Sequence, residues 1–150
     1  MRFRIVLLPL TLASCGAHNW PEDSFPPELE VERTLFSKAP YGIRETCEAM
    51  VVEITDRSAM LLQRNRRPLN GRWDTEPPKG WLASPMPTST DAKSYYKSAF
   101  SGCNDDHRHP LGDLAGAVQR PGAYYRVINN GEGIAIILPR AKLAGFFYFG

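Results

Sequence analysis

The C-terminal part of the chain holds three β-prone runs, and they constrain the fold more than any other feature. The runs cover residues 123–128, 133–138 and 143–149, with two short connections between them. The first connection contains Asn129-Asn130-Gly131, and asparagine and glycine tolerate the positive φ that tight hairpins need. Both alternating sets of positions are apolar in much of the last two runs, which indicates a sheet covered on both faces. We therefore expect an antiparallel three-stranded meander.

The segment 43–64 shows an apolar pattern with a helical period. Charged residues separate apolar ones that recur every three or four positions, namely Ile43, Cys47, Met50, Val51, Ile54 and Leu61. This spacing predicts an amphipathic helix over 43–64 that packs on one face of the sheet. The alternative is a strand over 50–54 that ends at Asp56-Arg57-Ser58. With the helix, the fold class is α+β, one amphipathic helix on a small antiparallel sheet.

The remaining segments carry weaker patterns. Five prolines between residues 65 and 90 exclude a long helix or strand there, and Leu69-Asn70-Gly71 is typical of a turn. Residues 91–100 fit a short helix that Gly102 would end, and a strand is the alternative. Residues 104–122 contain several glycines and prolines and are predicted to form a loop.

The first fifteen residues combine a positive start, a short apolar run and a cysteine. The run that follows Arg2 and Arg4 is too short to span a bilayer as a helix and is typical of a secretory signal. It ends in Leu12-Ala13-Ser14-Cys15, which resembles the bacterial lipobox. This resemblance to lipoprotein precursors implies cleavage before Cys15 and a diacylglycerol on its thiol. The alternatives are an ordinary signal peptide cut after Ala17 and a buried N-terminal element of a cytosolic domain.

The lipobox divides the chain into three parts. Residues 1–14 would be the signal peptide, 15–40 the lipidated cysteine with an extended acidic and proline-rich tether, and 41–150 a single small globular domain. Within the tether, residues 29–36 could dock as an edge strand. Gly16 stands where an aspartate would signal inner-membrane retention in Gram-negative lipoproteins. The resemblance therefore implies a lipid-anchored location in the cell envelope, on the outer membrane facing the periplasm in a Gram-negative host.

One lipid and one disulfide account for all three cysteines. Lipidation of Cys15 leaves Cys47 and Cys103, and thiols in an oxidising compartment pair and persist. We therefore predict a disulfide between Cys47 and Cys103. The alternatives are two buried thiols or a metal pair.

The charge balance argues against nucleic acid as a partner. The chain has 18 basic and 16 acidic residues, and removal of Arg2 and Arg4 leaves 16 of each, whereas nucleic-acid binding needs a basic excess. Arginines gather locally at residues 64, 66, 67 and 72. This cluster is either a solvated helix end and loop or a patch that faces anionic lipid or lipopolysaccharide.

The densest set of titratable side chains is Asp105-Asp106-His107-Arg108-His109. Asp105, His107 and His109 could ligate a divalent metal, yet neighbours in one loop rarely close three sites of a tetrahedron. An exposed polar loop is the simpler interpretation. The chain contains no Gly-x-Ser-x-Gly elbow and no Cys-x-x-Cys pair, so the sequence favours a non-catalytic role and predicts no cofactor.

A binding or structural role in the envelope is therefore the expected function, with a small periplasmic hydrolase or metal-binding protein using residues 105–109 as the alternative. The partners would be the membrane, through the lipid on Cys15, and an envelope protein. A tryptophan in a loop either fixes that loop to the core or lines a ligand groove. The candidate contact surface consists of aromatic residues with nearby arginines, namely Trp73, Trp81, Tyr95, Tyr96, Arg66, Arg67 and Arg72.

Overall fold

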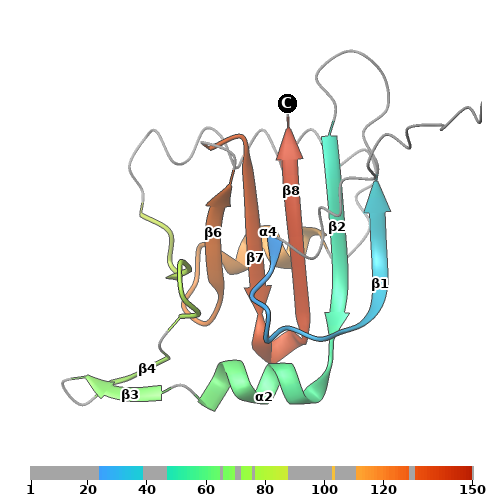
Figure 1. Ribbon diagram of the computed structural model, residues 1–150. Helices are drawn as coiled ribbons and strands as arrows, with labels where there is room; N and C mark the ends of the chain where they lie inside the picture. Colours follow the sequence, from blue (N-terminus) through green and yellow to red (C-terminus); the bar gives the residue numbers. More distant parts are fainter. Residues whose placement is uncertain are drawn as a thin grey trace, which may run out of the picture.

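A computed structural model describes residues 24–38, 47–64, 66–69, 72–75, 77–87, 103, 111–128 and 131–149. Its centre is a six-stranded antiparallel sheet in the order β1-β2-β8-β7-β6-β5 (Figure 1). The strands are β1 (Val31–Lys38), β2 (Cys47–Ile54), β5 (Leu82–Ala83), β6 (Tyr124–Ile128), β7 (Gly133–Leu138) and β8 (Leu143–Phe149). The helical elements are α2 (Asp56–Arg64), α4 (Leu111–Ala117) and the 3₁₀ turn η2 (Pro139–Ala141). A separate hairpin consists of β3 (Arg66–Leu69) and β4 (Arg72–Thr75).

The predicted C-terminal meander is confirmed. β6 pairs with β7, and β7 with β8, both antiparallel, with Tyr124 opposite Ile137 and Ile137 opposite Ala144. The connection between β7 and β8 is η2 followed by Lys142, whose φ of 54° lies in the left-handed region. The sheet is nevertheless wider than expected, because β1 and β2 add to β8 on one side and β5 adds to β6 on the other.

The helix predicted over 43–64 is wrong for residues 47–54, which form β2. Successive side chains of β2 enter opposite cores, with Cys47, Ala49 and Val51 on one face and Val52 and Ile54 on the other. A strand buried on both faces has apolar residues at both parities, and such a run also contains three- and four-residue spacings. The β-branched residues favour the strand. The helical pattern holds only from Asp56 onward, in α2.

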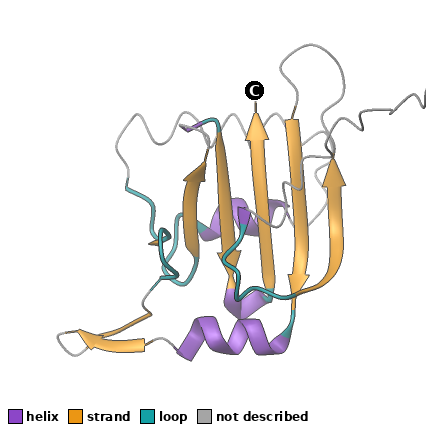
Figure 2. Cartoon of the chain, in the orientation of Figure 1, coloured by secondary structure: helices purple, strands orange, loops and turns teal. Residues whose placement is uncertain are grey.

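The sheet is covered on both faces, as the apolar runs predicted. Behind the sheet in Figure 1 lies α4, whose Leu114 is completely buried against β7 and β8. In front lies the segment 24–30, here called the strap, which inserts Phe25 into the second core. The helix α2 closes the end of the sheet instead of covering a face (Figure 2).

The loop predicted over 104–122 is wrong for residues 111–117, which form α4. Gly112 and Gly116 lower the intrinsic helix propensity of this short segment. Burial of Leu114 and Ala117 against the sheet overrides that propensity.

The predicted disulfide between Cys47 and Cys103 is confirmed. The two Cα atoms are 5.1 Å apart, and both residues are buried in the core on the α4 side of the sheet. The bond thus ties the start of β2 to a segment 56 residues further along the chain.

Candidate ligand groove

The strap begins inside the segment that the sequence assigned to the tether. Ser24, Phe25 and Pro26 are buried, and the chain then leads into β1, which pairs with β2 along the edge of the sheet. Residues 31–38 therefore form an edge strand, close to the one that the sequence allowed at residues 29–36. Residues 15–23 and 39–40 of the predicted tether lie outside the described residues.

An apolar groove runs between the strap and the first two strands. Its volume is about 610 Å³. The strap contributes Phe25, Pro26, Pro27 and Leu29, whereas β1 and β2 contribute Val31, Thr34, Met50 and Val52. Val31 remains 48% exposed although its side chain lines the groove. Seven of these eight side chains are apolar, so the groove suits an apolar ligand, with the Thr34 hydroxyl as its polar side-chain group.

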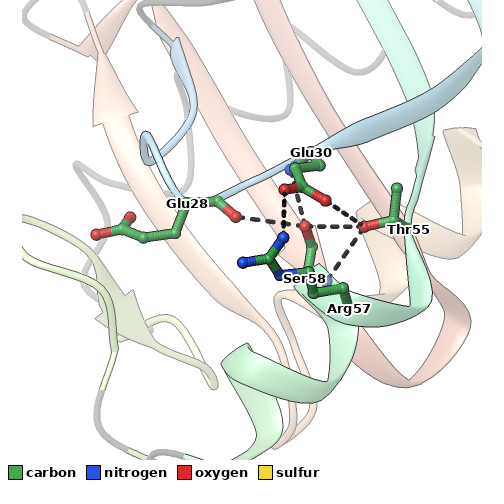
Figure 3. Close-up of polar contacts among 5 residues, drawn as sticks. All are labelled: Glu28, Glu30, Thr55, Arg57 and Ser58. Carbon is green, nitrogen blue, oxygen red and sulfur yellow. Dashed lines mark hydrogen bonds and ion pairs between the residues drawn. The ribbon is translucent and has the colours of Figure 1, made fainter.

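Ser58 holds the end of the strap against α2 (Figure 3). Its Oγ accepts a hydrogen bond from the backbone N–H of Glu30 at 2.8 Å and donates one to the carbonyl of Glu28 at 3.3 Å. Ser58 is 1% exposed, so these bonds are largely shielded from water. The hydroxyl thereby satisfies two polar groups of the strap backbone where it passes over the helix.

Thr55 joins this cluster as the N-cap of α2. Its Oγ1 accepts a hydrogen bond from the Ser58 N–H at 3.2 Å, which satisfies one of the free donors of the first turn. The same oxygen lies 3.2 Å from Ser58 Oγ and 3.3 Å from Glu30 Oε2. Arg57 contacts the other carboxylate oxygen of Glu30 at 3.4 Å, in a largely exposed ion pair. One cluster thus caps the helix and fastens the strap (Figure 3).

The beginning of the strap has a second attachment. The guanidinium of Arg126 donates a hydrogen bond to the carbonyl of Ser24 at 3.1 Å. The same guanidinium lies over the ring of Trp81, 5.5 Å from its centroid, in a cation–π contact. Because the strap is held at both ends, the wall that it forms over the groove has a defined position.

Two ionisable groups near these elements have shifted pKa values. Asp56 raises the pKa of Lys142 by accepting a hydrogen bond from it, at 2.9 Å, and by its opposite charge. Burial raises the pKa of Tyr125, whose ring lies in the core on the α4 side. Both shifts favour the protonated form, and neither group lines the groove.

The structure describes part of the candidate contact residues. Trp81 is 3% exposed and packs in the core beside Phe25, so it fixes its loop and is not part of an exposed surface. Trp73, Arg66, Arg67 and Arg72 lie on the β3–β4 hairpin. Outside the described residues lie Cys15, Tyr95, Tyr96, Asp105, His107 and His109. The metal-binding alternative at residues 105–109 therefore stays a prediction.

The groove itself was missed in the sequence. The signal for it was the apolar set Phe25, Pro26, Pro27 and Leu29, which interrupts an otherwise acidic segment. The prolines and acidic residues of this segment predict a tether, because the segment shows neither a helical nor a strand period. A bulky aromatic followed by two prolines also suits a segment that crosses a sheet without joining its hydrogen-bond ladder.

A scan against protein-family models, a search of curated proteins and a search of solved structures each find no match for this chain. In the described part of the chain, no group of three or more His, Cys, Asp or Glu side chains is placed to hold a metal ion. None of the helices within the described ranges is both long and apolar enough to cross a membrane.

Proposed function

We propose that the chain is a lipid-anchored protein of the bacterial envelope whose folded domain binds an acyl chain without catalysing a reaction. The observation that carries the binding role is the apolar groove between the strap and strands β1 and β2. Its volume falls within the range of about 300–1,000 Å³ that is typical of small-molecule sites. The lipobox-like residues 12–15 support the anchor, which would hold the groove beside a membrane, where acyl chains are the abundant apolar ligands.

The polar cluster at Ser58 supports binding over catalysis at this place. A nucleophilic serine needs access to substrate and a base within hydrogen-bond reach. The Ser58 hydroxyl is buried and already bonded to the strap backbone at Glu28 and Glu30. It therefore acts as a fastener of the groove wall.

Filling the groove tests the binding role. Thr34 lies on the exposed strand β1 and lines the groove, so Thr34→Trp should place an indole in the space of the ligand while the sheet stays intact. We expect a fluorescent fatty acid to bind the parent protein and to bind this variant at least about tenfold more weakly, a change of about 1.4 kcal/mol.

The matched control is Leu35→Trp, which adds the same ring to the neighbouring exposed position outside the groove lining. Equal loss of binding in both variants, or no binding to the parent, would refute the groove as the site.

Substituting Cys15 tests the anchor. Because the residues 12–15 resemble a lipobox, Cys15→Ser should abolish incorporation of a palmitate analogue and leave a larger, unprocessed precursor. The control is Cys103→Ser, which leaves the lipobox intact and should retain the label. Label that persists on the Cys15 variant would exclude the lipobox.

A further inference from the structure

We propose that the outer face of α2, together with the β3–β4 hairpin, docks on an anionic phospholipid surface. This surface lies at the end of the sheet, and none of its residues lines the groove. The proposal goes beyond the proposed function, because it assigns a second contact with the membrane, and its choice of partner rests on the proposed lipid anchor at Cys15.

The outer face of α2 has the composition of an interfacial helix. Its buried side carries Ser58, Ala59 and Leu62. Arg57, Met60, Leu61 and Arg64 follow the i, i+3, i+4, i+7 spacing and are all exposed, so they share the opposite face. Met60 is 50% exposed and Leu61 44%. Two apolar side chains flanked by two arginines can enter the headgroup region while the guanidinium groups stay at its polar level.

The β3–β4 hairpin follows α2 in the chain and contains further arginines. It projects away from the sheet (Figure 1). Arg66 stands opposite Thr75, Arg67 opposite Asp74 and Leu69 opposite Arg72 in its register. Residues 56–75 together hold five arginines and two aspartates, whereas the chain from residue 15 is balanced in charge. The stretch 56–75 therefore carries a net positive charge.

Two acidic residues at this end form ion pairs. Asp56 lies 2.9 Å from Lys142, and Glu30 pairs with Arg57 at 3.4 Å. Arg140 of η2, which contacts α2, is exposed and adds a further positive charge. Residues 56–75 and Arg140 together carry six arginines against two aspartates, so the local charge is mainly positive, which suits anionic headgroups.

Geometry allows this contact to coexist with the anchor. Eight residues separate Cys15 from Ser24. If this stretch is extended, Cys15 and Ser24 lie up to about 30 Å apart. A domain tethered within this distance experiences a high effective concentration of the same bilayer. A weak contact is therefore enough to orient the domain. This proximity favours a phospholipid surface over an acidic protein as the partner.

Vesicle binding tests the proposal without the lipid. The chain from residue 15 with Cys15→Ser contains every residue that the structure describes and carries no acyl group. It is expected to bind vesicles that contain phosphatidylglycerol and not vesicles of phosphatidylcholine alone, with affinity that falls as salt rises. Arg64→Gln should weaken binding about fivefold. Met60→Ser combined with Leu61→Ser should weaken it about tenfold.

The control variants carry substitutions of the same kind at other exposed positions. Leu82→Ser with Val127→Ser removes two exposed apolar side chains from β5 and β6, and Arg120→Gln removes an exposed arginine after α4. Both should bind like the parent chain. Equal binding to the two vesicle types, equal loss in the control variants, or binding of polyglutamate without vesicle binding would overturn the proposal.

Discussion

Loss of the disulfide is expected to lower the free energy of unfolding by about 4 kcal/mol. The bond between Cys47 and Cys103 closes a loop with a sequence separation of 56 residues. In the chain-entropy model, opening such a loop restores a large number of conformations to the unfolded state. Cys47 also starts β2, which pairs with the central strand β8, so the constraint acts on the part of the sheet where N-terminal and C-terminal strands meet.

Urea unfolding measures this loss. The free energy of unfolding of the double variant Cys47→Ala/Cys103→Ala is compared with that of the oxidised parent. The reduced parent is the matched control, since it has both thiols and lacks only the bond. It should lose nearly as much stability as the double variant. Two thiols that react freely with an alkylating agent in the native oxidised protein would contradict the predicted bond and the effect.

Ser58→Ala is expected to cost about 1–3 kcal/mol, because it leaves the Glu30 N–H without its acceptor at a partly buried position. The carbonyl of Glu28 loses its donor in the same change. We further expect faster hydrogen–deuterium exchange in residues 24–30, since the strap would lose its fastening to α2.

Ser37→Ala serves as the control for this change, because Ser37 lies on the exposed strand β1 outside the strap. It should change stability by less than about 0.5 kcal/mol. If both variants unfolded at the same urea concentration, the hydrogen bonds of Ser58 would not hold the strap.

The meander and the disulfide were predictable, because each depends on a local or compositional signal. Three β-prone runs with short connections leave few alternatives to antiparallel pairing. The odd number of cysteines, together with the resemblance of residues 12–15 to a lipobox, left Cys47 and Cys103 to pair. Neither inference required knowledge of how distant segments meet.

The wider sheet was predictable only in part. The sequence allowed an edge strand at 29–36 and, as an alternative to the helix, a strand over 50–54, but the choice between these structures depends on distant partners. β1 contains Glu32 and Arg33 and is mostly exposed. Its strand conformation therefore depends on pairing with β2. β2 itself has both helical and strand spacings, and its burial between two cores decides between them. The groove could not be predicted either, because its walls come from segments that meet only in the folded chain: the strap and two strands of the sheet.

The order of strands in the sheet has a consequence for how the molecule folds. The strand β8 is the last of the six along the chain, yet it lies between β2 and β7 near the middle of the sheet. Until residues 143–149 pair with β2, β1 and β2 have no neighbour that connects them to the meander. The pairing of Cys47 with Phe149 in the register spans most of the domain, and contacts of such long sequence separation slow folding. The six-stranded sheet therefore cannot be completed before residues 143–149 take their place between β2 and β7.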